Sequence, residues 1–337
     1  MAAAESVPRV VVGDRRRRGW LVATVAATVA PIAFAVVSAP PGSAPAGAAL
    51  TWVLFVGSSV HVASTAWFYC VPEVRKHMVA HQVRYLLVPA FLVLGCVVTA
   101  SVVPERRTTW LLLTFFGWQF FHFQKQNLGL AALAARSHGA GSLTVWERRA
   151  LTVAGIGGVV ALLGHPDLLQ VAGAHRTSAL FAAGGVLFAS GVLGGAWTAS
   201  RRRSGQRPAQ FLAVYAVSLI FFLPVFVFAS PYAAVAGLTI AHGLQYLLIM
   251  GLVAAGPAKV DSSVLVLVNI ALLLGLGLNR MSHLHGASAA GRALYGLFLG
   301  LSVSHFVIDA GLWRLRDEFP RAFLTRRLPY LLAPAQL

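Results

Sequence analysis

Four histidines of the 337-residue chain lie deep inside apolar stretches that are long enough to cross a bilayer. They are His61, His122, His242 and His305. An ionisable side chain in hydrocarbon is costly, so it is rare there and usually has a function. A lone histidine in a helix bundle is more often a hydrogen-bonded core residue, but four on four helices predict one metal site.

Each of these histidines has a polar companion three or four residues further on, where residues share a helix face. A metal-bound histidine usually donates its other ring N–H to such a group. The companions are Thr65, Gln126, Gln245 (with Tyr246 beside it) and Asp309. Asp309 and Lys125 are the acid and the lysine that we place well inside a span. Both are costly against lipid, so we expect them to face the same interior.

The composition predicts an all-α polytopic membrane bundle. The chain is 58% hydrophobic and 11% charged, whereas a soluble domain carries about 25% charged residues. A spanning helix needs about 20 mostly apolar residues. We expect ten spans, which form a single bundle over 19–313 between basic tails at 1–18 and 314–337. The spans are 19–38, 48–70, 85–103, 109–134, 150–164, 178–199, 209–229, 231–255, 260–279 and 289–313.

The basic residues predict the orientation. With both termini in the cytoplasm, 21 of the 27 Lys and Arg residues fall on the inner side, as the positive-inside rule requires. The net charge of +17 therefore indicates contact with lipid headgroups, not nucleic acid. The bias toward Ala, Gly, Val and Arg suits a high-GC bacterium, and we expect the protein in the inner membrane. The first span could alternatively be a cleaved signal peptide, which would leave nine helices and the same site.

The four histidines are expected to share one layer of the membrane. The spans 48–70, 109–134, 231–255 and 289–313 all run from outside to inside in this topology. At about 1.5 Å per residue, the histidines differ in depth by only about 7–8 Å. A site near the midplane opens to lipid-dissolved molecules, which favours redox or oxygen chemistry on an apolar substrate.

Imidazole ligands suit iron, copper or zinc. Four histidines without bridging glutamates favour one ion over a di-iron pair. Other histidines give weaker signals. His77 and His81 form an i, i+4 pair that could approach the site from the cytoplasmic side. His283 and His285 form an HLH sequence in an outer loop.

Four short motifs resemble, in order, those of the Brp/Blh family of bacterial membrane β-carotene-cleaving dioxygenases. They are VHVAST at His61, FHFQKQ at His122, AHGLQY at His242 and SHFVID at His305. The last is the best match, although its acid lies at i+4 and the family's at i+5. Where the family has acids the first two motifs have Thr65 and Gln126. The third has Tyr246 in place of a second histidine.

The resemblance implies Fe(II) held by the four histidines, with O2 and a lipophilic, carotenoid-like or lipid-like molecule as substrates. It implies that Asp309 fixes the tautomer of His305, and that Gln126 and Gln245 do the same for their neighbours. Tyr246 would donate a hydrogen bond to oxygen. Substrate orientation and exclusion of water would come from the surrounding protein.

Three other classes of protein remain open. A proton-coupled transporter could use a midplane relay of His, Asp and Lys. A b-type haem protein would use histidine pairs and show a Soret band. In a structural membrane protein the histidines would only connect helices, and single His→Gln changes would have little effect.

Overall fold

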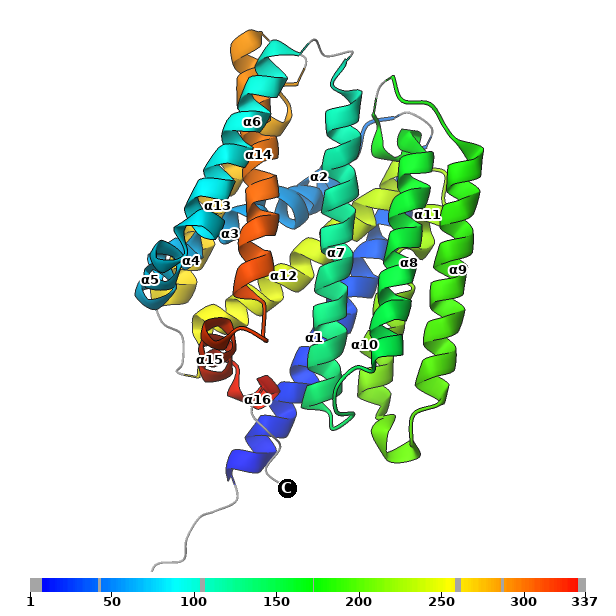
Figure 1. Ribbon diagram of the computed structural model, residues 1–337, viewed down its shortest axis with the longest axis vertical. Helices are drawn as coiled ribbons and strands as arrows, with labels where there is room; N and C mark the ends of the chain where they lie inside the picture. Colours follow the sequence, from blue (N-terminus) through cyan, green and yellow to red (C-terminus); the bar gives the residue numbers. More distant parts are fainter. Residues whose placement is uncertain are drawn as a thin grey trace, which may run out of the picture.

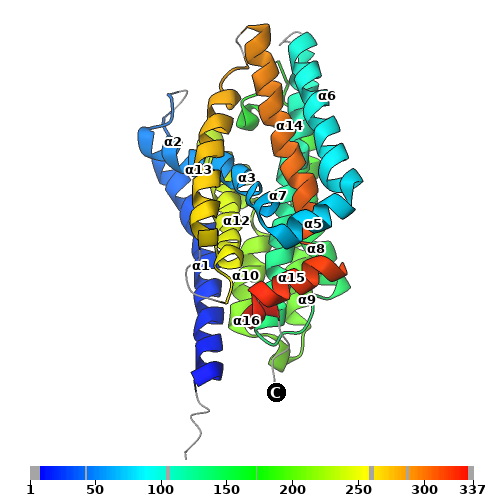
Figure 2. The same cartoon turned by 90° about the vertical axis from the view of Figure 1, so that its left-hand side faces the viewer.

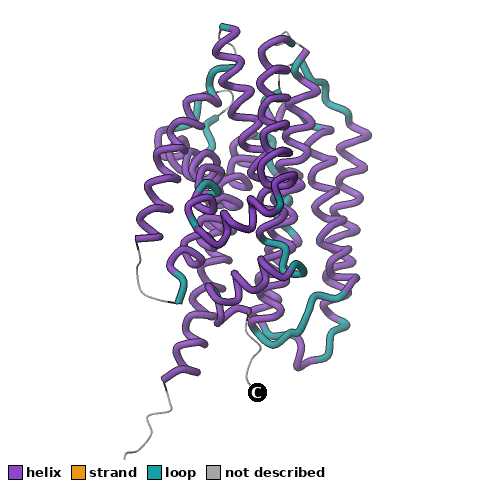
Figure 3. The backbone as a smooth tube through the Cα atoms, turned by 60° about the vertical axis from the view of Figure 1, so that its left-hand side comes forward, coloured by secondary structure: helices purple, strands orange, loops and turns teal. Residues whose placement is uncertain are grey.

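The computed structural model describes residues 8–41, 44–103, 107–171, 173–257, 262–285 and 288–332. Every regular element in these ranges is helical, as Figure 3 shows. The all-α prediction is therefore confirmed for this part of the chain. The first seven and last five residues of the expected basic tails lie outside it, as does Lys259 of the basic residues assigned to the inner side.

Seven helices of the described ranges are long and apolar enough to cross a membrane, which indicates a membrane protein. Their ends lie within four residues of the expected spans. They are Arg15–Ser38 within α1 (Pro8–Ser38), Ala48–Cys70, Val83–Val102, α9 (Ser178–Ser200), Tyr232–Ala255, α13 (Ser262–Ser282) and α14 (Ala289–Leu312).

Three further expected spans are helical but less apolar or shorter. They are α7 (Thr109–Ser137), which carries Lys125, α8 (Val145–Gly164), which begins with charged residues, and α10 (Ala209–Leu219). The expectation of one continuous helix over 209–229 is wrong. The chain bends after α10 and continues as α11 (Leu223–Val227). Pro224 lacks the N–H needed to continue the hydrogen-bonding pattern.

Several spans contain π-helical turns, which often occur at functional sites. In Ala48–Cys70, the turn η1 directly precedes His61. The segments of this span are α2 (Ala48–Phe55), η1 (Val56–Val60), α3 (His61–Ser64) and α4 (Trp67–Cys70). The other composite spans are η2 (Val83–Leu87) with α6 (Val88–Val102), and η6 (Tyr232–Ala236) with α12 (Gly237–Ala255). Short elements between spans are α5 (Pro72–Ala80), η4 (Pro166–Leu169) and η5 (Ser204–Gln206).

The long helices form two groups on either side of α7. In Figure 1, α6 and α14 lie together on one side, and α8 and α9 lie together on the other. Helix α12 crosses obliquely behind α14 and α7 and contacts α1, α13 and the α2–α3 segment. The view from the side in Figure 2 shows α13 in front of α12, with α14 to the right of it. Thus α12 connects helices that are far apart in the sequence.

Two glycines allow α12 to pack directly on the span that carries His61. A Cβ atom on Gly243 would collide with the backbone of Gly57, and one on Gly57 would collide with the backbone of Ile240. Only glycine permits this close approach of two helix backbones. Because Gly243 follows His242 and Gly57 lies one turn before His61, this contact brings the two histidines together.

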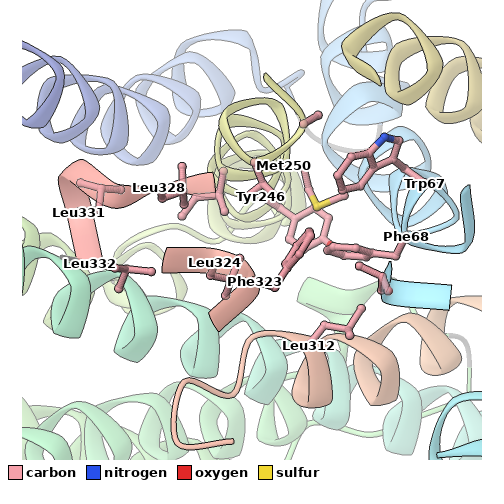
Figure 4. Packing of buried hydrophobic residues seen from close by; sticks show 14 of the residues in the cluster. Trp67, Phe68, Tyr246, Met250, Leu312, Phe323, Leu324, Leu328, Leu331 and Leu332 are labelled. Atoms are coloured by element: carbon pink, nitrogen blue, oxygen red, sulfur yellow. The ribbon is translucent and has the colours of Figure 1, made fainter. Parts of the chain in front are cut away.

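The C-terminal segment is folded and not a simple tail. It forms α15 (Glu318–Arg327) and α16 (Pro329–Leu332), whose apolar side chains are buried under the bundle. Figure 4 shows Phe323 and Leu324 beside Tyr246, Met250 and Leu312. The arginines of this segment led to the prediction of a basic tail. Several of them are exposed, but the apolar residues between them pack inward.

Both ends of the described chain lie at the same end of the bundle. Arg17 near the start of α1 donates from Nε to the carbonyl oxygen of Tyr330 in α16, at 2.7 Å. Arg326 of α15 pairs with Glu73 of α5 at 2.5 Å. These contacts fix α15 and α16 against that end, which forms a closed base below the interior.

Candidate metal centre

The four membrane histidines meet at one point inside the bundle. They come from α3, α7, α12 and α14, and their rings form a closed circuit of neighbours. Ring centroids are 5.0 Å apart for His61 with His242 and for His242 with His122, and 5.2 Å apart for His122 with His305 and for His305 with His61. Adjacent rings meet edge to face, at 72–89°. The predicted convergence of the four histidines is therefore present in the structure.

The spacing of the rings fits four imidazoles around one ion. A nitrogen bound at about 2.1 Å places its ring centroid roughly 3.2 Å from the metal, so neighbouring centroids lie roughly 4.5–5.2 Å apart for ligand angles of about 90–109°. The ligand atoms of His61, His242 and His305 all lie within 4.8 Å of one another. The same limit holds for His122, His305 and Asp309.

The ring nitrogens lack hydrogen-bond partners although they are buried. Both nitrogens of His61 and His242, and Nε2 of His122 and of His305, have no partner of good geometry. His61, His242 and His305 are at most 2% exposed, and the side chain of His122 is 11% exposed. An unpaired buried polar group costs about 1–3 kcal/mol, and each of the four rings has at least one such nitrogen, so one nitrogen per ring is free to bind a metal ion.

Asp309 faces the ligand nitrogens. Its Oδ2 lies 3.6 Å from Nε2 of His305 and 4.0 Å from Nε2 of His122, and the residue is 3% exposed. The expectation that Asp309 itself binds the far side of His305, at Nδ1, is wrong. The i+4 spacing brings the carboxylate to the same face as the imidazole, but toward Nε2 and not toward Nδ1.

Thr65 occupies the position expected of Asp309. Its Oγ1 lies 2.6 Å from Nδ1 of His305 and 3.0 Å from the hydroxyl of Tyr246. Tyr246 in turn donates to Oδ1 of Asp309 at 2.8 Å. Thr65 was expected to serve His61 on its own helix, and this is wrong. Its hydroxyl points across the helix interface to α14 and α12.

Gln126 and Gln245 lie next to the site but do not contact the histidine rings they were expected to orient. Nε2 of Gln126 donates to the carbonyl of His242 at 2.9 Å and to Oε1 of Gln245 at 2.8 Å. Nε2 of Gln245 donates to Thr28 of α1 at 2.7 Å and, at 3.4 Å, to Asn127. These amides connect α1, α7 and α12, and thereby hold the backbone that carries His242.

Two basic side chains that the sequence analysis considered for the site lie away from the four histidines. Lys125 is exposed, with Nζ 5.4 Å from the ring of Phe121, so the expectation that it faces the histidines is wrong. On a helix it lies about 60° around the axis from His122, which suffices to turn it outward. His81, directly after α5, is also exposed, and its ring lies 4.3 Å from that of His77, tilted by 39°.

Two phenylalanines that the sequence analysis did not assign support the rings. Phe123 stacks on His242 at 4.0 Å, and Phe306 stacks on His122 at 4.6 Å. Each directly follows a histidine, in a repeated His-Phe pair, and each packs on a histidine of another helix. This repeated pair is the sequence feature that could have predicted the two phenylalanines as part of the site. The stacked rings restrict rotation of the imidazoles and keep water from the site.

Comparisons with known proteins give no match. No protein-family model fits the sequence, and no curated protein or solved structure shows significant similarity to it. The Brp/Blh resemblance therefore stays a prediction that depends on the four motifs alone.

Proposed function

We propose that the chain is a membrane-embedded metalloenzyme whose single ion, iron in the first instance, is held by His61, His122, His242 and His305. The observation that carries this proposal is the closed ring of four buried imidazoles whose inward nitrogens have no other partner. An all-nitrogen set without thiolate suits iron, and also copper or zinc. A bound iron would supply redox chemistry and activation of dioxygen, in an oxygenase-type reaction.

The protein residues around the ring would bind and orient an apolar substrate and keep water out. Phe123 and Phe306 cover two imidazoles, and the cluster around Met250 and Phe323 closes the base. His122 is the histidine with an exposed edge, and Trp118, one turn earlier on α7, is 40% exposed. This edge beside α14 is the route that we propose for a lipophilic substrate, of carotenoid or lipid type, entering from the bilayer.

We further propose that the chain crosses a bacterial inner membrane ten times, with both termini in the cytoplasm. The shared position of α1 and α16 and the distribution of arginines support an even number of crossings. Cysteines introduced at the exposed positions Arg203 and Arg280 test it. An impermeant thiol reagent should label position 280 in intact cells and position 203 only after lysis. The reverse pattern would invert the topology.

Elemental analysis of detergent-purified protein tests the metal. We expect about one ion per chain, lost in His305→Ala and kept in Lys125→Gln, which changes an exposed cation on the helix of His122. A metal-free wild-type protein would refute the metal centre and favour the proton-coupled transporter. A Soret band would instead indicate haem.

A further inference from the structure

Both oxygens of one carboxylate are connected to both nitrogens of one imidazole. On one side, Oδ2 of Asp309 faces Nε2 of His305 at 3.6 Å. On the other, Oδ1 of Asp309 accepts from Tyr246, whose oxygen lies 3.0 Å from that of Thr65, which lies 2.6 Å from Nδ1 of His305. All four residues are buried, at most 4% exposed, so the three hydrogen bonds of this chain are shielded from water.

The donors in this chain can be ordered because each hydroxyl carries a single hydrogen. Tyr246 donates its hydrogen to Oδ1 of Asp309. The tyrosine oxygen must then accept from Thr65, and the oxygen of Thr65 must accept from Nδ1–H of His305. The neutral ring consequently has its lone pair on Nε2, the nitrogen that faces His122 and Asp309.

The opposite order of donors exists and is incompatible with a ligand role. If Oδ1 of Asp309 carried the hydrogen, Asp309 would donate to Tyr246, Tyr246 would donate to Thr65, and Thr65 would donate to Nδ1. The neutral ring then has its proton on Nε2 and cannot bind a metal ion. The chain of hydroxyls thus permits two orders of donors, and only the first leaves Nε2 of His305 free to bind a metal ion.

We infer that Thr65 and Tyr246 are positioning residues that select the Nδ1–H tautomer of His305 and so prepare Nε2 as a ligand. This inference rests on the proposed metal centre. Neither residue is on the helix of His305: Tyr246 comes from α12, and Thr65 comes from the turn after α3. Their hydroxyls determine the tautomer of His305 on a third element, α14. A single chain of hydrogen bonds thus connects the three elements.

Zinc binding and the NMR signals of nitrogen-15-labelled histidine test the inference. Zn²⁺ is a diamagnetic probe that accepts imidazole ligands, and the His305 signal is identified by its loss in His305→Gln. In the zinc-loaded wild type we expect a hydrogen-bonded Nδ1–H at His305. Thr65→Val keeps the shape and removes the hydroxyl. It should lose the hydrogen-bonded Nδ1–H signal and weaken zinc binding about 10- to 100-fold, as loss of a ligand's outer partner does.

Three further variants separate positioning from packing. Thr65→Ser retains the hydroxyl and should restore both the signal and the affinity. Tyr246→Phe frees Thr65 to donate to Nδ1, so zinc binding should weaken. Thr24→Val is the matched control, since it removes a buried hydroxyl of α1 that donates to the carbonyl of Trp20 on its own helix, and it should bind zinc like the wild type.

The outcomes distinguish this inference from the proposed function. Equal zinc affinity in Thr65→Val and Thr65→Ser, with binding abolished in His242→Gln, would overturn the inference and leave the metal centre intact. Undiminished zinc binding in both Thr65→Val and His242→Gln would overturn the metal centre itself.

Discussion

The cluster around Arg202 and the four histidines are both buried, and they differ in how completely their polar atoms are paired. Arg202, at the end of α9, donates to both carboxylate oxygens of Glu147 and to the carbonyls of Ala140 and Ser142. Glu147 also forms a capping box with Thr144 at the start of α8. The four histidines are similarly buried, yet six of their eight ring nitrogens have no hydrogen-bond partner.

The difference indicates what each cluster is for. A fully hydrogen-bonded ion pair has no capacity left for a ligand, so the cluster of Glu147 and Arg202 holds α8 and α9 together. A cluster with unpaired acceptors costs stability unless something else fills the site. The two clusters therefore predict opposite results when one member is replaced by an apolar side chain.

The largest effect on stability is expected from Glu147→Leu. It leaves the Arg202 guanidinium buried without a carboxylate, and breaking a buried pair in this way costs about 3–5 kcal/mol. Unfolding in mixed micelles measures the loss. Metal content per folded chain should stay unchanged, because no residue of the pair contacts a histidine. A variant as stable as the wild type would show that the pair of Glu147 and Arg202 does not hold α8 and α9 together.

The next largest effect is expected from His242→Leu, measured by metal binding. Removing one ligand should lower metal affinity by more than about 100-fold, because even loss of an outer partner costs 10- to 100-fold. The metal-free variant should be as stable as the metal-free wild type or more so, since no hydrogen bond of the ring is lost. A large loss of stability without metal would mean that His242 is a structural residue.

A smaller effect is expected from Gly243→Ala, which tests how the ring is assembled. The added methyl group collides with the backbone of Gly57, and such overpacking typically costs about 1–3 kcal/mol. Because the contact sets the distance between His61 and His242, metal affinity should fall as well. Gly251→Ala on the same helix is the control, since open space surrounds that position. Equal behaviour of the two variants would argue against the close contact.

The smallest effect is the pH dependence that Glu147 of the paired cluster contributes to stability. Burial alone raises the pKa of Glu147, but hydrogen bonds from Arg202 and Thr144 outweigh it and hold the pKa below its usual value of 4.5. The folded state therefore binds fewer protons than the unfolded state, and stability falls as the pH drops below 4.5 through the folded pKa. Unfolding followed from pH 7 downward should show this loss in the wild type and not in Glu147→Leu.

Much of the fold was predictable because hydropathy and length determine the spans. Ala48–Cys70 and Ser178–Ser200 begin at the expected residues, and the shared depth of the histidines followed from their positions along such spans. The break between α10 and α11 was missed although Pro224 marks it. The apolar run continues through the bend, and hydropathy does not distinguish a bend from a helix.

The partners of the histidines were less predictable, for a physical reason. Spacing of i+4 relates residues of one helix, whereas Thr65 contacts His305 of a different helix and Tyr246 of a third. Those interfaces depend on the rotation and crossing of helices, which contacts such as Gly57 with Gly243 determine. Lys125 shows the same problem. In a helix that is apolar on most sides, the sequence does not reveal which face meets lipid.

The most direct test is X-ray absorption spectroscopy at the edge of the metal that the purified protein carries. Four histidines around one ion predict about four nitrogen or oxygen neighbours at roughly 2.0–2.2 Å, with the outer-shell scattering of imidazole rings. The imidazole contribution should diminish in His242→Leu. A spectrum without imidazole scattering, or one identical in the wild type and in that variant, would contradict a metal centre built by these four histidines.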